Sequence, residues 1–438
     1  MRLWTISSDR QEFDRYKTLV DGSLKHSVTA DMLNAALPLA AKGFIGKGAH
    51  IAAVHDGSDI RKEHSQDLES LGKVRSLSGG IVNGYQTMNT VLVDTQSKAL
   101  RLLQSTPYSN RSVEYCSSND AKAQKKAKIS KEASNTSAFV AEIPASVPLT
   151  SPPEIASSKS KQEETATEAR ILREHLRRAS ETVRSAQADA RTTHILDRKH
   201  DENALFRFIA DELQDTFVIR LKVSRNSFET STDPTGKARA VKLAERTYAK
   251  QTIRYFSKIR LGKRVFQDAR LVLDYDTVTL GNHSYSVIRA DYQDRKGRSI
   301  FPKPMLLVSN LPLAKDADAE YIFRLYMLRS LIEEVFHFLK MTLGWEDIQV
   351  RDWTSHQALL TLCFFIGGYF YEIESALTKN PNIARICELG GGKAKITRTF
   401  FLRGLADLMK AQSVQEYFRR NNVSQEDQDA MFAFVQWR

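Results

Sequence analysis

The segment Tyr321–Leu343, YIFRLYMLRSLIEEVFHFLKMTL, constrains the fold of this chain more than any other stretch. Its apolar residues recur at the spacing of an α-helix, which advances about 100° per residue. One face is apolar and predicts packing on a core, through Leu328, Leu331, Ile332, Val335 and Leu339. The other face carries a polar stripe about 21 Å long, made of Tyr326, Arg329, Glu333 and Lys340.

This polar stripe has two interpretations. A surface helix normally has a solvated polar face, and that alone would account for the four residues. A carboxylate between cations and a phenol also suits a site for a metal ion and a phosphate. In that interpretation Glu333 ligates a divalent ion, and the other three residues bind the backbone of a nucleic acid.

The spacing of the stripe is Y-x2-R-x3-E-x6-K, which resembles the signature of the IS4-family DDE transposases and matches it without a gap. The resemblance implies that Glu333 is the third catalytic carboxylate. It also implies that Tyr326, Arg329 and Lys340 contact DNA near the transposon end. Two further carboxylates must then lie upstream.

Composition agrees with a DNA-binding protein. The 438 residues carry a net charge of +12, which favours a polyanionic partner, nucleic acid before membrane. Three cysteines without a CxxC pair exclude a disulfide scaffold and a zinc finger. The start lacks the pattern of a signal peptide, and the longest apolar run, Ala358–Tyr371, is too short to span a bilayer. A cytoplasmic protein with no membrane partner is expected. The resemblance further implies that the protein is bacterial and associated with the nucleoid.

The first candidate acid is Asp56, which we expect at the end of a short buried strand in AHIAAVHDGSDI. Two β-rich segments follow at Ile81–Val93 and Ala99–Gln104, around a turn at Asp94–Ser97. The second candidate is Asp197, at the end of a strand in THILDRKHD and before a helix at about Asn203–Leu213. The contexts of both residues look like the first-Asp and second-Asp motifs of the family.

Three acids from separate elements are what two-metal phosphoryl transfer requires, because one run of acids cannot surround two ions. Asp56, Asp197 and Glu333 are therefore the predicted catalytic residues and metal ligands. Four other acids compete with them: Asp59 and Asp201, expected in a turn and at a helix start, and Asp274 and Asp276, expected to be exposed on a strand.

The chain is expected to be an α/β protein with an RNase H-like mixed sheet flanked by helices and interrupted by a β-rich insertion. Residues 1–48 are predicted to be helical, with helices at Arg10–Leu24 and Thr29–Lys42 and an N-cap at Ser27 or Thr29. The core is predicted at 49–224 and 318–378, with a flexible insertion at 109–163 and the β-rich insertion at 225–317. A helical region, 379–438, would pack on the core or join a subunit contact.

The resemblance also implies an activity. A transposase of this family binds two Mg²⁺ or Mn²⁺ ions, cleaves double-stranded DNA at the element ends, and joins the freed 3′-OH to target DNA as a homodimer. Two departures bear on this. The segment before the first strand is shorter than a full DNA-recognition domain, and Met305 stands where some relatives carry a Trp able to stack on a displaced base. The alternative is a catalytically inactive, transposase-derived DNA-binding protein or inhibitor of transposition.

Overall fold

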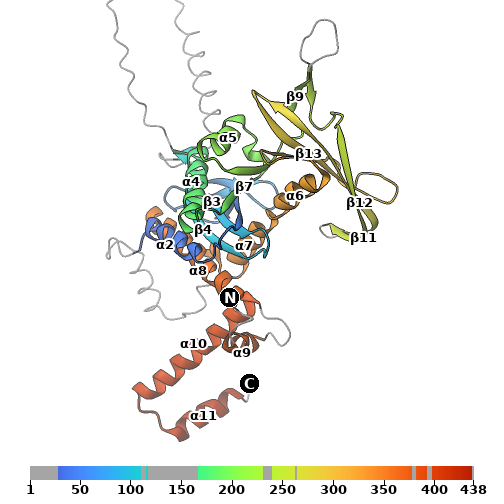
Figure 1. Ribbon diagram of the computed structural model, residues 1–438. Coiled ribbons are helices and arrows are strands. Elements are labelled where there is room, and N and C mark those ends of the chain that lie inside the picture. The colour runs from blue at the N-terminus through green and yellow to red at the C-terminus, as the bar shows by residue number, and fades with distance from the viewer. Residues whose placement is uncertain are drawn as a thin grey trace, which may run out of the picture.

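A computed structural model describes residues 28–109, 115–116, 166–229, 239–261, 264–376, 381–391 and 397–436. These residues form a mixed ten-stranded sheet with helices on both faces (Figure 1). The predicted α/β class, with a mixed sheet flanked by helices, is confirmed. The helix expected at Arg10–Leu24 and nearly all of the insertion expected at 109–163 lie outside the described residues.

Five strands make the part of the sheet expected of an RNase H-like core: β1 (His50–Arg61), β3 (Ile81–Asp94), β4 (Leu100–Tyr108), β7 (Arg191–Leu196) and β8 (Thr216–Arg220). The first three pair antiparallel in chain order, and β7 and β8 continue parallel to β1 on its other side. The turn predicted at Asp94–Ser97 joins β3 to β4. A short strand that was not predicted, β2 (Gly72–Arg75), pairs with β3.

The strands of the expected β-rich insertion extend this same sheet. They are β11 (Lys250–Leu261), β12 (Arg264–Leu280), β13 (His283–Gln293) and β14 (Met305–Ser309). The last of them pairs antiparallel with β8 of the core, and the others follow outward in the order β13, β12, β11. A two-stranded ribbon, β9 (Asn226–Glu229) with β10 (Arg239–Lys242), stands beside them. The backbone hydrogen bonds of the sheet thus run across the expected boundary at 225.

Helices cover the two faces of the sheet unequally. On one face lie α4 (Glu168–Ala186) and α5 (Asn203–Arg207), the latter continued by a π-helical turn at Phe208–Glu212. On the other lie α6 (Asp316–Met327), α7 (Ser330–Met341) and α8 (Trp353–Ala376). Successive residues of a strand point to opposite faces, so β1 contributes to both layers of the core.

The core of β1 follows that alternation. Ala52 and Val54 belong to the apolar cluster that contains Ile332 and Val335 of α7. Ala53 belongs to a different cluster, with residues of α4. Burying each of the larger aliphatic side chains stabilises the fold by about 1.5–3 kcal/mol. Residues of β1 with even numbers therefore face α6 and α7, which decides where Asp56 points.

The helix predicted at Tyr321–Leu343 is wrong as a single element. The structure has two helices, α6 and α7, that meet at Leu328 and Arg329. Both residues keep right-handed helical dihedrals, but their N–H groups bond three residues back, to the carbonyls of Leu325 and Tyr326. A 3₁₀ turn therefore interrupts the α-helical ladder, which periodicity alone does not reveal.

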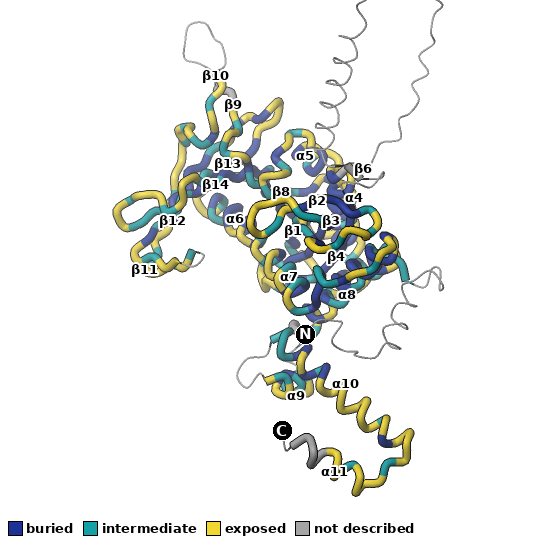
Figure 2. Tube along the Cα trace, turned by 180° about the vertical axis from the view of Figure 1, so that it is seen from behind, coloured by how far each residue is buried: buried dark blue, intermediate teal, exposed yellow. Residues whose placement is uncertain are grey.

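Helices at both ends of the described chain complete the structure. The predicted helix at Thr29–Lys42 is α2 (Ala30–Lys42), and Thr29 caps it by accepting a hydrogen bond from the Met32 N–H. Beyond α8 lie α9 (Pro381–Leu389), α10 (Arg398–Arg420) and α11 (Gln425–Gln436). The last two extend away from the sheet and are largely exposed (Figure 2). Among the described residues, no helix is long and apolar enough to cross a membrane.

Candidate active site

Asp56 and Asp197 lie at the same level of the sheet, Asp56 within β1 and Asp197 directly after the neighbouring strand β7. β1 and β7 are parallel, and their last paired residues are Val54 and Ile195. Continuing that register by two residues sets Asp56 beside Asp197. Asp56 is two residues after Val54, and Asp197 is two residues after Ile195. Val54 and Ile195 both face α6 and α7, so the two acids point to the same face of the sheet.

The expected position of Asp56 at a strand end needs correction. Asp56 lies in the middle of β1, which continues to Arg61 because its antiparallel pairing with β3 continues that far. The parallel neighbour, β7, ends at Leu196. The β7 side of β1 is thus open from Asp56 onward, and a carboxylate there can be reached from the α6–α7 side.

One guanidinium joins two of the three predicted acids. An Nη atom of Arg329 lies 2.7 Å from Oδ2 of Asp56, and its other Nη lies 2.6 Å from Oε1 of Glu333. The side chains of Arg329 and Asp56 are only 19% and 17% exposed, whereas that of Glu333 is 59% exposed. The site is therefore half-buried at β1 and open at α7.

The charges of Asp197 and Glu333 act on Asp56. The pKa of Asp56 is raised to about 6, chiefly by burial, with the negative charges of Asp197 and Glu333 adding to the rise and Arg329 opposing it. Burial lowers the pKa of Arg329, but nearby Asp56, Tyr326 and Asp197 outweigh burial, and the pKa is raised. Asp56 and Glu333 thus share one cation, and the charge of Asp197 acts on both Asp56 and Arg329.

The donor set suits a hard divalent cation, because carboxylate oxygens are the ligands that Mg²⁺ and Mn²⁺ prefer. Their arrangement is not that of a preformed metal centre. Within the part of the chain that the structure describes, no group of three or more His, Cys, Asp or Glu side chains is close enough to hold a metal ion. The oxygens of Asp56 and Glu333 instead face the guanidinium between them.

Tyr326 and Lys340, the other two residues of the stripe, point inward. Tyr326 is 4% exposed and hydrogen-bonds with the Arg220 side chain; its pKa is raised, chiefly by burial. Lys340 donates to the carbonyl of Asp59 over 2.5 Å and lies 3.1 Å from a carboxylate oxygen of Glu346. Burial lowers the pKa of Lys340. These contacts join α6 to β8 and α7 to β1.

The competing acids have other partners. Asp59, expected in a turn, lies within β1 and accepts a hydrogen bond from the Arg75 N–H. Asp201 is buried and accepts from the Lys222 N–H. Asp274, expected to be exposed, is buried and ion-paired with an arginine of β13, Arg289. Arg289, on the neighbouring strand, compensates the charge of Asp274 and so allows its burial. The spacing of residues in the sequence does not show which residues face each other across two strands.

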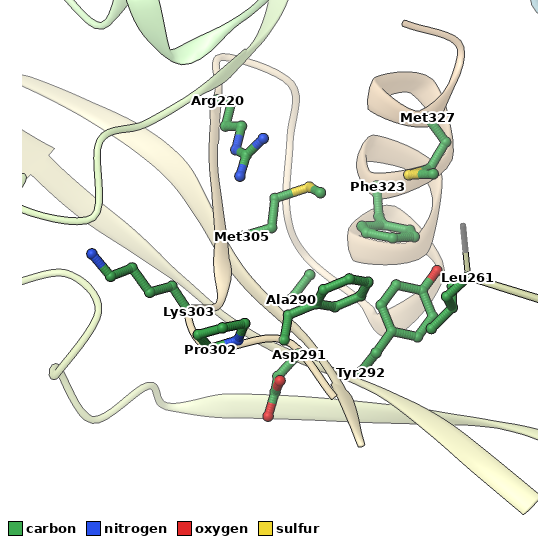
Figure 3. Close-up of a pocket in the computed structure, with 11 residues that line it drawn as sticks. Arg220, Leu261, Ala290, Asp291, Tyr292, Pro302, Lys303, Met305, Phe323 and Met327 are labelled. Atoms are coloured by element: carbon green, nitrogen blue, oxygen red, sulfur yellow. The ribbon is translucent and has the colours of Figure 1, made fainter. Parts of the chain in front are cut away.

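A pocket of about 610 Å³ lies between α6 and the strands β13 and β14. Figure 3 shows Arg220, Met305 and Phe323 around this space. Aromatic rings form much of its wall, because Tyr292 lies edge-on to both Phe301 and Phe323. Arg220 belongs to this pocket and also bonds to Tyr326, so the pocket adjoins the site.

Two residues near the acids were missed from the sequence. Arg220 ends β8 one strand away from Asp197, and only the order of strands reveals that neighbourhood. His200 follows Asp197 by three residues, and burial is the main cause that lowers its pKa to about 4. The DRKH run could have drawn attention to His200, since it lies one turn beyond the acid.

A buried chain of histidines supports β1 and β7 from the opposite face. Nε2 of His55 lies 3.0 Å from Nδ1 of His194, and Nε2 of His194 lies 3.1 Å from a carboxylate oxygen of Asp215. Nδ1 of His55 lies 2.8 Å from Oγ1 of Thr90, which also contacts His175. These contacts link β1 and β7 on the face of the sheet opposite to Asp56.

Comparison with known proteins adds independent evidence. A search of curated proteins found no match. Residues 156–366, just under half of the chain, match a family model described as Transposase DDE domain. The matched range contains Asp197 and Glu333, whereas Asp56 lies before it and depends on the geometry given above. The match and the mixed sheet flanked by helices together support a DDE transposase with an RNase H-like fold.

Proposed function

We propose that this chain is a transposase of the IS4 type, which cleaves DNA at the ends of an insertion sequence and transfers the strands to a target. Asp56, Asp197 and Glu333 would hold two Mg²⁺ or Mn²⁺ ions. When bound, such ions activate the attacking water or hydroxyl and stabilise the departing 3′ oxygen. The observation that carries the proposal is the joint contact of Asp56 and Glu333 with Arg329, with the charge of Asp197 acting on Asp56.

The chain's own groups have distinct tasks in this reaction. The two aspartates stand on paired strands, so the sheet fixes their separation. Glu333 is on a helix packed against that sheet and is open to solvent, where DNA can approach. Arg329 would neutralise a phosphate oxygen of the bound strand. Tyr326 and Lys340 would contribute near the same backbone, as the family signature implies.

The outer strands offer further surface for double-stranded DNA. Alternate residues of β11 place four exposed cations on one side of the strand: Lys250, Arg254, Lys258 and Arg260. Phosphate contacts from such a row would position the duplex without reading its sequence. The aromatic pocket beside Arg220 would receive an unpaired base from the cleaved end, because base stacking on aromatic rings tolerates any sequence.

A homodimer on paired ends is part of the proposal. The exposed helices α10 and α11 carry apolar side chains in contact with solvent: Leu408, Met409, Val414, Tyr417 and Met431. A second copy of the chain would cover them. Light scattering of the protein with and without end DNA tests this part separately from catalysis.

The central test is metal-dependent nicking of DNA that carries the ends of the element. We expect the wild type to nick in Mg²⁺ or Mn²⁺, and Glu333→Gln to lose at least about 10³-fold in rate, as removal of a catalytic group does. Glu334→Gln, an exposed neighbour on α7, is the matched control and should retain activity. Equal activity of wild type and Glu333→Gln would refute the catalytic assignment.

The second candidate is a DNA-binding protein without catalysis, such as an inhibitor of transposition. The inward-facing contacts of Lys340 and the absence of a preformed metal cluster among the described residues favour it. In that case wild type and Glu333→Gln would bind end DNA equally, and neither would nick it in any divalent metal.

A further inference from the structure

Arg329 is a basic residue held at the centre of an acidic site. Its two terminal nitrogens bind Asp56 and Glu333, and both atoms they contact are oxygens that a metal ion would need. The guanidinium fills the space between these two oxygens, and its positive charge repels a cation placed there. A divalent ion that bridges Asp56 and Glu333 would therefore have to displace it.

The hydrogen-bonding capacity of the Arg329 guanidinium is only partly used in this position. Its Nε atom is buried and has no hydrogen-bond partner among the described residues. A buried donor without a partner is unfavourable, so a position of Arg329 in which Nε reaches water or a phosphate oxygen would be favoured. Its single positive charge also offsets only part of the charge of the three carboxylates Asp56, Asp197 and Glu333.

Arg329 lies at a break between two helices, next to solvent, where its side chain can change position. Arg329 lies at the 3₁₀ junction of α6 and α7, and Glu333 is one helical turn further along the chain. The side chain is 19% exposed at its open end, next to a Glu333 carboxylate that is mostly in solvent. A phosphate that arrives from that side would meet the planar donors of the guanidinium, which match its oxygens.

We propose that Arg329 is an exchangeable counter-ion of the catalytic acids. Before metal binds, it holds Asp56 and Glu333 together and competes with divalent ions for their oxygens. When ions bind, it is displaced and becomes a phosphate ligand for DNA. This proposal rests on the proposed function, because it requires that the acids bind metal.

Two consequences follow from this exchange. Metal and DNA bind cooperatively, because each favours the same displaced position of Arg329, and by linkage the effect is reciprocal. A chain without the guanidinium binds metal more tightly in the absence of DNA. The opposite role, in which Arg329 preorganises the acids for metal, predicts weaker metal binding when the guanidinium is removed.

The test is a titration of the DNA-free protein with Mn²⁺, with free Mn²⁺ followed by its electron paramagnetic resonance signal. We expect Arg329→Gln to bind Mn²⁺ about tenfold more tightly than the wild type, because a competing unit charge next to a half-buried carboxylate is removed. Arg329→Lys should fall between the two. Arg324→Gln, an exposed arginine of α6, is the matched control and should leave the affinity unchanged. Melting temperatures establish that each variant is folded.

Asp56→Asn and Glu333→Gln separate the possible failures. If these substitutions weaken Mn²⁺ binding but Arg329→Gln does not strengthen it, the exchange is wrong and the metal site stands. If the wild type and Arg329→Gln bind no Mn²⁺ that depends on the two acids, the proposed function itself fails, and the exchange fails with it.

Discussion

The carboxylate of Asp56 and the guanidinium of Arg329 form a 2.7 Å ion pair between residues 273 positions apart in the chain. This contact closes the junction of α6 and α7 onto the middle of β1. It makes the electrostatics of the site a property of the folded protein as a whole, since neither residue has the other near it in sequence. The first prediction concerns its effect on stability.

The pKa of Asp56 predicts how stability changes with pH. Its folded value of about 6 is above the ordinary 3.8, so the folded state binds more protons between these values and the free energy of unfolding falls as pH rises. Asp56→Asn removes this loss. We expect the variant to match the wild type near pH 3.5 and to exceed its stability by about 2–3 kcal/mol above pH 6.5. Urea unfolding across this range measures the difference, and a difference independent of pH would contradict it.

Lys340 is predicted to have a structural role that can be separated from DNA binding. Lys340→Met removes a donor to the Asp59 carbonyl and an ion pair with Glu346, and should lower the free energy of unfolding by about 1–2 kcal/mol. If Lys340 also contacts phosphate, the same variant should reduce the salt dependence of DNA binding by about one charge. Glu346→Gln disturbs the ion pair while keeping the lysine, so it serves as control: its salt dependence should equal that of the wild type.

The buried histidine chain is predicted to hold the two acid-bearing strands together. His194→Phe leaves Nε2 of His55 without its partner and removes one contact of Asp215, which keeps Ser180 and Arg184. A buried polar atom without a partner costs about 1–3 kcal/mol, and we expect a loss of this size by urea unfolding. The exposed His283, replaced by Phe, provides the comparison. A loss of the same size in both variants would show that the chain of contacts is not the cause.

The aromatic pocket gives a prediction about the cleaved end. Met305→Trp adds a stacking surface to its wall, and stacking of a base is worth about 1–3 kcal/mol. End DNA labelled with 2-aminopurine near the cleavage site should therefore be quenched more strongly by this variant than by the wild type. Val265→Trp, on an exposed part of β12, is the control. Equal quenching by the two variants would argue that no base enters the pocket.

Local patterns predicted much of this structure. The strand carrying Asp56, the strand before Asp197 and the cap at Thr29 all follow from short-range rules, because turn residues and alternation act within a few positions. The prediction that Asp56, Asp197 and Glu333 act together came from a family resemblance. What sequence could not give was non-local: β14 pairs with β8 across the chain, and Asp274 is buried by a cation on a neighbouring strand.

The division of the signature helix shows the same limit at short range. Apolar spacing through Leu328 continues without interruption, yet the backbone tightens there and begins a new helix. A 3₁₀ hydrogen bond joins residues three apart and an α-helical one joins residues four apart. One such turn leaves the spacing of the apolar residues almost unchanged. Packing against the sheet, rather than the pattern of residues, decides where such a turn falls.

Because β14 pairs directly with β8, the described strands from β11 to β1 belong to one continuous sheet. A duplex bound to the cations of β11 would be held at a fixed position relative to the acids, because backbone hydrogen bonds connect the strands between them. The width of the sheet would then set the distance between the bound duplex and the cleavage site. Shortening or lengthening these strands would leave that distance intact, whereas adding or removing a strand between β11 and β8 would change it.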